Sequence, residues 1–317
     1  MTRELDMSNA GGMRGQVAVV TGASRGLGRV YAETFARLGA QVVLVARNRQ
    51  QLEEVVCAIR ARGGEAVAVA TDVTDQQAVE RAFAMVDSRY GHIDLLVNNA
   101  GCLGSTGLTW ELDAEAWWNT LELHVRGGLY CIQQALRRMV PRGRGRIVSL
   151  ASHAGVYRWP TLSAYSVAKA ALIKLTENVA VETRKHGVVL FAFHPGIVRN
   201  VGLLPDMQSG GSTRPEIVDT LAWLNRQVAD GRSVTAEQSA AVLVQLASGR
   251  YDFLNGRYVT VYDDLDLLSE QADQIRQGDA LTLRLACGEE TAASRCRVAV
   301  ANEELADVSL SMRNWAC

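Results

Sequence analysis

Short apolar runs alternate along the chain with longer stretches whose apolar residues recur at helical spacing. A run rich in valine or leucine is typical of a buried strand, whereas apolar positions three and four residues apart form one face of a helix. Regular alternation of the two predicts a parallel sheet covered by helices on both faces. The predicted strands cover residues 16–20, 41–45, 66–70, 93–97, 147–150, 188–193 and 257–262.

One doubly wound α/β domain over residues 16–264 accounts for this pattern. Residues 1–15 are polar and lack periodicity, which predicts a loose N-terminal tail. Residues 265–317 form a C-terminal extension, in which apolar spacing around Ile275 predicts a helix, alternation over residues 281–285 predicts a strand, and the polar end is expected to be disordered. The predicted helices of the domain cover residues 52–61, 76–90, 114–138, 215–228 and 235–247, with others after the first strand and from Tyr165 on.

The first strand runs directly into a glycine-rich segment, Thr-Gly-Ala-Ser-Arg-Gly-Leu-Gly, that precedes a helical pattern. Its glycines permit positive φ angles and close approach to a ligand, while the following helix offers unpaired N–H groups to a phosphate. The pyrophosphate of a dinucleotide fits such a turn, as in Rossmann-type domains. A nucleoside-triphosphate loop is excluded because Arg29, not lysine followed by serine or threonine, follows the last glycine. The residues predicted to contact the dinucleotide here are Gly22, Ser24, Arg25, Gly26, Leu27 and Gly28.

The end of the second strand bears on the choice between NAD and NADP. An acidic residue there accepts hydrogen bonds from the ribose 2′-hydroxyl of NAD, whereas arginine accommodates the 2′-phosphate of NADP. This chain has Arg47 at that place and Arg25 in the glycine turn, which favours NADP(H). NAD(H) stays open, since Asp72 or backbone groups could serve its ribose instead.

Tyr165 and Lys169 stand four residues apart in a helical pattern, so their side chains share one helix face. The ammonium group is expected to lower the pKa of the phenol from its reference value of about 10, which makes Tyr165 a usable general acid or base. Ser152 follows the fifth strand, and the loop containing Gly155 and Pro160 can bring its hydroxyl back to the tyrosine. Ser152 would then hold a substrate oxygen.

Composition narrows the range of partners. The 33 basic and 34 acidic residues give a formal net charge of −1, so no overall field favours nucleic acid or an anionic membrane. The six cysteines lie far apart and the histidines lack metal-ligand spacing, which predicts reduced thiols and no metal site. The N-terminus has no apolar signal core and no apolar run is long enough to cross a bilayer, so a cytoplasmic protein is expected.

The motifs occur together and in one order: the glycine turn, Asn98-Asn99-Ala100-Gly101, Ser152 thirteen residues before Tyr165, and Pro195-Gly196. In this combination, over residues 16–261, the chain closely resembles the classical short-chain dehydrogenase/reductase family. The resemblance implies reversible hydride transfer between a nicotinamide cofactor and a carbonyl or secondary alcohol, a catalytic set of serine, tyrosine and lysine, and assembly as a homodimer or homotetramer. It also implies that the cofactor contacts Asp72, Val73, Asn99, Ala100, Gly101, Tyr165, Lys169, Pro195, Gly196, Ile197 and Val198.

One position departs from the family pattern. Relatives carry an asparagine where this chain has His124, and that asparagine kinks a helix and holds a water on the catalytic lysine. Histidine can also hold a water, but with a reference pKa of about 6.5 it would become a second cation near Lys169. A proton relay with altered pH dependence is therefore predicted, and a helix histidine without a catalytic part is the alternative.

Residues 200–233 correspond to the substrate loop of the family and contain several glycines and prolines around a predicted helix. Their apolar side chains predict a pocket for an apolar carbonyl or alcohol of low molecular weight. Two other functions stay open: an enzyme of this fold that eliminates, dehydrates or epimerises, and a non-catalytic NADP(H)-binding regulator. The intact serine, tyrosine and lysine set weighs against the regulator. The predicted apolar wall consists of Leu203, Leu204, Met207, Trp223 and Leu224.

Overall fold

Seven parallel strands form one sheet in the computed structural model, which describes residues 12–199, 201 and 215–285. The strand order is β3-β2-β1-β4-β5-β6-β7, so the chain winds outward from β1 to β3, returns to β4 beside β1, and then winds outward the other way. This topology confirms the doubly wound α/β class. The strands are β1 (Val17–Thr21), β2 (Gln41–Ala46), β3 (Glu65–Ala70), β4 (Leu95–Asn98), β5 (Gly145–Leu150), β6 (Val188–His194) and β7 (Arg257–Thr260).

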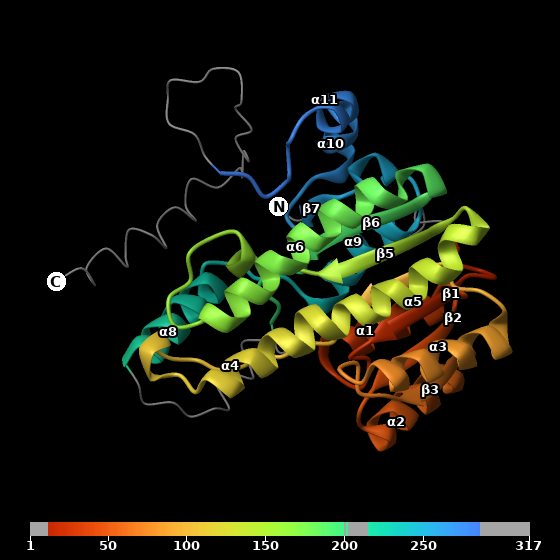
Figure 1. The fold of residues 1–317 in the computed structure, drawn as a ribbon, viewed down its shortest axis with the longest axis horizontal. Helices are drawn as coiled ribbons and strands as arrows, with labels where there is room; N and C mark the ends of the chain where they lie inside the picture. Colours follow the sequence, from red (N-terminus) through yellow and green to blue (C-terminus); the bar gives the residue numbers. More distant parts are fainter. Residues whose placement is uncertain (1–11, 200, 202–214, 286–317) are drawn as a thin grey trace.

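Helices cover both faces of the sheet (Figure 1). Alternate strand residues point to opposite faces, so Ala18 and Val20 of β1 enter a core with α1, α2 and α9, whereas Val17 and Val19 enter a core with α3, α5 and α6. None of the helices in the described part of the chain is both long and apolar enough to span a bilayer. The helices are α1 (Gly26–Arg37), α2 (Arg49–Ala61), α3 (Gln76–Tyr90), α4 (Ala114–Leu121), α5 (Gly127–Arg142), α6 (Ser163–Thr183), α8 (Pro215–Ala229), α9 (Ala236–Ala247), α10 (Leu265–Glu270) and α11 (Ala272–Gln277).

Polar side chains fix where several of these helices begin. Asn48, Asp75 and Asp113 each accept a hydrogen bond from the backbone N–H three residues further on, at the starts of α2, α3 and α4. Thr235 and Gln238 form a reciprocal pair of such bonds at the start of α9. The starts predicted at residues 76, 114 and 235 agree with the structure to within one residue, whereas α2 begins three residues before its predicted start at residue 52.

The helix predicted over residues 114–138 is divided into two. α4 ends at Leu121, a π-helical turn covers Glu122–Arg126, and α5 follows from Gly127. Turns of this kind are often found at functional sites, because the extra residue redirects a side chain. His124 lies in the turn and is only 3% exposed. The expected distortion is therefore present at the position of this histidine.

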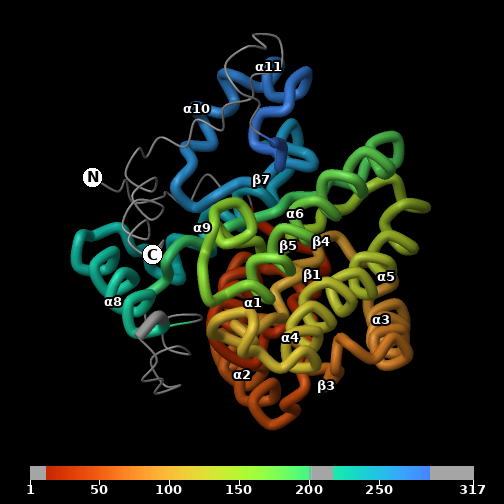
Figure 2. The backbone as a smooth tube through the Cα atoms, turned by 60° about the vertical axis from the view of Figure 1, so that its left-hand side comes forward, coloured from red at the N-terminus to blue at the C-terminus, as the bar shows by residue number. Residues whose placement is uncertain are grey.

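The start of the C-terminal extension, α10 and α11, lies beside β7 at the opposite end of the sheet from β3 (Figures 1 and 2). Leu265 and Ile275 enter the core cluster of α1 and α9. The strand predicted over residues 281–285 is wrong. The Tyr258 N–H donates to the Leu281 carbonyl at 2.8 Å, but Leu281 has a φ of 60°, which interrupts an extended run. The rest of the extension lies outside the described residues.

Residues 12–15 belong to the packed domain and not to a loose tail. Met13 is buried, and its N–H donates to the Leu38 carbonyl at 2.9 Å beyond the end of α1. The tail predicted over residues 1–15 is therefore wrong in its last part, because the apolar side chain of Met13 packs against the core. Residues 1–11 lie outside the described residues.

Candidate active site

The glycine turn between β1 and α1 packs closely against the end of β4. A Cβ on Gly28 would lie 2.3 Å from the Gly22 carbonyl oxygen, and a Cβ on Gly22 would lie 2.9 Å from the Cα of Ala100. Asn99 Nδ2 donates to the Thr21 carbonyl at 2.8 Å, and the Thr21 hydroxyl accepts from the N–H groups of Asn99 and Ala100, both at 2.9 Å. Glycine is therefore required at two positions of the turn, and Asn99 fastens the turn to β4.

The N-terminal end of α1 is open toward a ligand. Among the described residues, no side chain caps its first turn, so backbone N–H groups and the positive end of the helix dipole are open to another acceptor. Gly26, Leu27 and Gly28 of this turn line a cavity. A phosphate is the group that such a helix end binds best. We call the turn from Gly22 to Gly28 the glycine cradle. Because side chains at Gly22 and Gly28 would fill it, its shape fits the pyrophosphate of a dinucleotide.

One cavity of about 720 Å³ extends from the glycine turn past the carboxyl ends of β4, β5 and β6. All residues predicted to be catalytic or to bind the cofactor line it, because the carboxyl ends of parallel strands meet at one edge of a sheet. The structure brings the set together, and the role of each residue stays a prediction. The set comprises Gly22, Ser24, Arg25, Gly26, Leu27, Gly28, Arg47, Asp72, Val73, Asn99, Ala100, Gly101, His124, Ser152, Tyr165, Lys169, Pro195, Gly196, Ile197 and Val198.

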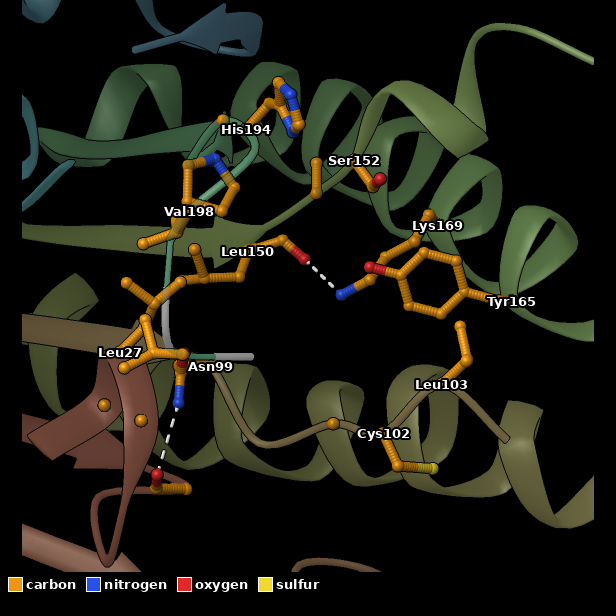
Figure 3. A pocket seen from close by; sticks show the side chains of 18 of the residues that line it. Leu27, Asn99, Cys102, Leu103, Leu150, Ser152, Tyr165, Lys169, His194 and Val198 are labelled. Carbon is orange, nitrogen blue, oxygen red and sulfur yellow. Dashed lines mark hydrogen bonds between the residues drawn. The ribbon is translucent and has the colours of Figure 1, made fainter. Parts of the chain in front are cut away.

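Tyr165 and Lys169 lie side by side on α6 (Figure 3). The Nζ of Lys169 is 5.4 Å from the centroid of the Tyr165 ring and donates to the Leu150 carbonyl at 2.6 Å, at the end of β5. Ser152 lies close enough to Tyr165 to lower the pKa of the phenol, and its hydroxyl accepts from the Ala154 N–H at 3.2 Å. The helix spacing and the loop after β5 therefore bring the three side chains together as the sequence predicted.

Burial governs the ionisation of this pair in the protein alone. Burial raises the pKa of Tyr165 to about 12, although the hydrogen bond from Ser152 acts in the opposite direction. It also lowers the pKa of Lys169 to about 7. The expectation that the tyrosine pKa lies below its reference value is wrong here, because the cost of removing the phenolate from water exceeds the opposing effect of Ser152. Tyr165 therefore carries its proton at neutral pH.

His124 reaches the same place from the π-helical turn. Its Nε2 lies 2.8 Å from the Cys102 carbonyl and 3.3 Å from the Cys102 backbone nitrogen, while Nδ1 is buried with no partner among the described residues. The shorter contact favours the hydrogen on Nε2, which leaves Nδ1 as an acceptor. The ring meets Tyr165 edge to face with centroids 5.6 Å apart, and it packs on Gly101, where a Cβ would lie 2.3 Å from Cε1. Burial, helped by the charge of Lys169, lowers the pKa of His124 to about 3. The second cation predicted near neutral pH therefore does not form.

Apolar side chains line the part of the cavity beneath α8. Trp159 and Trp223 meet edge to face with centroids 5.6 Å apart, and Leu103 and Leu224 lie in the same wall. Trp223 and Leu224 are thus where the sequence placed them. Leu103 and Trp159 are wall residues that were not predicted from the sequence. Leu103 stands two residues after Gly101 and Trp159 six residues before Tyr165, and this proximity to predicted motifs was the available signal. The other predicted wall residues, Leu203, Leu204 and Met207, lie outside the described residues.

Nicotinamide-dependent oxidoreductases of the doubly wound class combine such a phosphate cradle with a proton-transferring group at the same sheet edge. A family model described as short chain dehydrogenase matches residues 16–208. The chain therefore belongs to the short-chain dehydrogenase/reductase family, and it is an oxidoreductase acting on CH–OH or C=O groups.

Individual relatives agree with this assignment. The chain is 32% identical over 266 residues to a short chain dehydrogenase of Pseudocercospora fijiensis, covering 83% of this chain and 85% of the relative. It is 32% identical over 249 residues to the gluconate 5-dehydrogenase of Gluconobacter oxydans, covering 78% and 94%. Among solved structures, an NAD+-bound xylitol dehydrogenase and a levodione reductase each superpose with a TM-score of 0.71 at 28% identity, covering 78% of this chain and 98% and 96% of theirs. Family and neighbours together support a nicotinamide cofactor.

Proposed function

We propose that the protein is an NADP(H)-dependent oxidoreductase that interconverts a carbonyl and a secondary alcohol, with Tyr165 as the general acid and base. The observation that carries the proposal is the position of Ser152, Tyr165 and Lys169 around one cavity with the glycine cradle. A bound nicotinamide supplies or accepts the hydride. The residues of the chain then have to hold the substrate oxygen, move its proton and keep water away.

Each of the three side chains has a separate task in this proposal. Ser152 donates a hydrogen bond to the substrate oxygen and holds it beside the phenol. Tyr165 gives its proton to that oxygen during reduction and takes it back during oxidation. Because its pKa of about 12 keeps the phenol protonated at neutral pH, Tyr165 carries the proton that reduction requires. Lys169 holds the nicotinamide ribose and stabilises the phenolate as the proton leaves.

Purified protein mixed with NADPH and a panel of ketones, aldehydes and quinones tests the proposal directly. We expect loss of NADPH absorbance matched by an equal amount of alcohol. Conversion of a compound with no net change in NADPH would instead support elimination, dehydration or epimerisation. Binding of NADPH without conversion of any compound would support the regulator.

Arg47 is expected to set the preference for NADP(H). It is exposed and lines the cavity beside the glycine turn, as does Arg25. We expect the protein to bind NADPH at least about tenfold more tightly than NADH, and Arg47→Ala to remove most of that difference, because a hydrogen bond to a charged group contributes about 1.5–3 kcal/mol. Calorimetric titration with both cofactors measures the ratio.

Arg49→Ala is the matched control for this experiment. Arg49 is also exposed, lies two residues away at the start of α2, and faces Glu53 at 3.9 Å without lining the cavity. Its replacement should leave the NADPH to NADH ratio unchanged. Equal affinity of the unaltered protein for the two cofactors would contradict the NADP(H) assignment and favour NAD(H).

His124 is proposed to take the place of the family's asparagine through the lone pair on Nδ1. With a pKa of about 3, the imidazole stays neutral from pH 5 to 9, so its titration adds no limb to the pH profile of kcat in this window. His124→Asn, which keeps an acceptor, should therefore leave the apparent pKa values of kcat unchanged. An acidic limb that disappears in the variant would show that His124 does charge during turnover.

We further propose a homodimer formed through α4 and α6. Trp118 on α4 is 60% exposed, and Val167 and Val181 on α6 are 46% and 77% exposed, so apolar surface is left on both helices. We expect sedimentation to report at least a dimer and Val181→Lys to shift it toward the mass of one chain, because a charge at an apolar contact is costly. A monomeric unaltered protein would overturn this arrangement.

We also propose a cytoplasmic location for the protein, as expected from the sequence.

A further inference from the structure

Two histidines outside the catalytic set meet in the wall of the cavity. His194 ends β6, and His153 follows β5 directly after Ser152. Because β5 and β6 are parallel and Leu150 pairs with Phe193, the residues that follow these strands come side by side. The two imidazole centroids are 4.0 Å apart. We call His153 and His194 the histidine pair.

The histidine pair has hydrogen-bonding capacity that the described residues do not use. His194 Nδ1 and Nε2 and His153 Nε2 are buried and have no partner there. His153 Nδ1 lies 2.9 Å from the hydroxyl of Tyr258, which can donate to it, and the hydrogen of His153 is then on the unpartnered Nε2. Unpaired polar atoms in a protein interior cost stability, so such a cluster calls for a partner from elsewhere.

The position of the pair points to the substrate as that partner. Both histidines line the same cavity as Ser152 and Tyr165, and Figure 3 shows His194 next to Ser152. The charge of Lys169 contributes to lowering the pKa of His194, and Tyr165 contributes to raising the pKa of Tyr258. The histidine pair and its partner Tyr258 are therefore close to the catalytic side chains. A molecule held at Ser152 by its reacting oxygen would therefore extend past the histidine pair or past the apolar wall of Trp159 and Trp223.

The surroundings of the pair select for an uncharged group. Tyr157 meets His153 edge to face, Tyr262 stacks on it, and Tyr258 bonds to it, so no carboxylate touches the ring in these contacts. Burial lowers the pKa of His153 to about 4, and burial, His153 and Lys169 hold the pKa of His194 well below its ordinary value. A neutral imidazole offers one donor and one acceptor. Such a ring suits a hydroxyl or a carbonyl better than a carboxylate.

Resting on the proposed function, we propose that the histidine pair is a subsite for a second, uncharged oxygen of the substrate. The substrate class is then a hydroxy ketone or diketone, with the corresponding diol or hydroxy ketone as the reduced partner. One oxygen reacts at Ser152 and Tyr165, the other bonds to the histidine pair, and the hydrocarbon part lies against Trp159 and Trp223. His153 is in this view a residue that determines specificity.

Substrate pairs that differ only at the second oxygen test the subsite. Phenyl ketones with a hydroxyl one, two or three carbons from the carbonyl are compared with their methyl ethers, which cannot donate a hydrogen bond. For at least one pair, we expect kcat/KM with NADPH to favour the hydroxy ketone by about tenfold or more, since a site built for a hydroxyl discriminates against its absence. His153→Phe, which keeps a ring for the aromatic contacts, should reduce the ratio at least about fivefold.

Two further variants separate a specific contact from a change in folding. His153→Gln retains a donor and an acceptor and should recover part of the selectivity. His186→Phe is the matched control, because His186 is exposed beyond the end of α6 and should leave the selectivity unchanged. The melting temperature of each variant, with and without NADPH, shows whether it folds and binds cofactor.

The outcomes distinguish this inference from the proposed function. Turnover of plain ketones with no preference for any hydroxy ketone, or a preference that His153→Phe leaves intact, would overturn the subsite and keep the oxidoreductase. A keto acid of matching length that outperforms the hydroxy ketone would overturn its uncharged character. Absence of any turnover with NADPH or NADH would overturn the proposed function itself.

Discussion

Replacing Tyr165 by phenylalanine is expected to lower kcat/KM for carbonyl reduction by about a thousandfold, within the range of about 10²–10⁴ that a positioned acid contributes. The variant keeps the ring that packs against His124 and loses only the hydroxyl that Ser152 contacts. Steady-state kinetics with NADPH and a substrate found in the panel measures the loss. Because the missing group acts on the reacting oxygen, the change should appear in kcat more than in KM.

NADPH affinity provides the control for this variant. Tyr165→Phe should bind NADPH within a few-fold of the unaltered protein, since the glycine turn lies at the start of α1 and Tyr165 lies on α6. A matched variant, Tyr157→Phe, removes a hydroxyl at the cavity wall without removing the proposed acid. Full activity in Tyr165→Phe would contradict the assignment of the general acid.

Replacing Gly28 by alanine is expected to weaken NADPH binding by about 10- to 100-fold. The new Cβ would lie 2.3 Å from the backbone oxygen of Gly22 and 2.6 Å from Asn99 Nδ2, so the turn has to open. Overpacking of this kind costs about 1–3 kcal/mol, and here the strain falls on the backbone that holds the pyrophosphate. Calorimetric titration with NADPH gives the change in Kd.

Gly63→Ala is the companion variant for the cradle. Gly63, unlike Gly28, has a positive φ, of 79°, but a Cβ there would meet none of the described residues within 4 Å, and Gly63 lies outside the cavity. It should lower stability slightly, as alanine at positive φ does, and leave the Kd for NADPH unchanged. An unchanged Kd in Gly28→Ala would show that the turn does not hold the cofactor in the way proposed.

The sequence predicted those parts of the site that are local or that follow from a parallel sheet. Tyr165 and Lys169 meet because four residues make about one helical turn. The glycine turn, Ser152 and the segment from Pro195 to Val198 share a cavity because each follows a strand at one edge. No further information was needed to bring these residues together.

Other features depend on packing that no local pattern records. The ionisation of Tyr165 and His124 is controlled by loss of water, which depends on everything packed around them, so the pKa of the first was expected too low and that of the second too high. The contact of His153 with His194 requires the register of β5 and β6. Residues 281–285 have the alternation of apolar side chains that predicts a strand, but Leu281 has a left-handed backbone conformation, which is incompatible with continuous strand pairing.

The segment after α11 also protects the open side of the sheet. β7 is an edge strand, and the backbone N–H of Tyr258 would be a free template for pairing if the Leu281 carbonyl did not accept from it. The same segment is anchored on α6, where the buried Glu177 carboxylate accepts from the Leu283 N–H and from Arg284. Residues 281–284 therefore occupy one backbone donor of the edge strand and connect that strand to the helix that carries Tyr165.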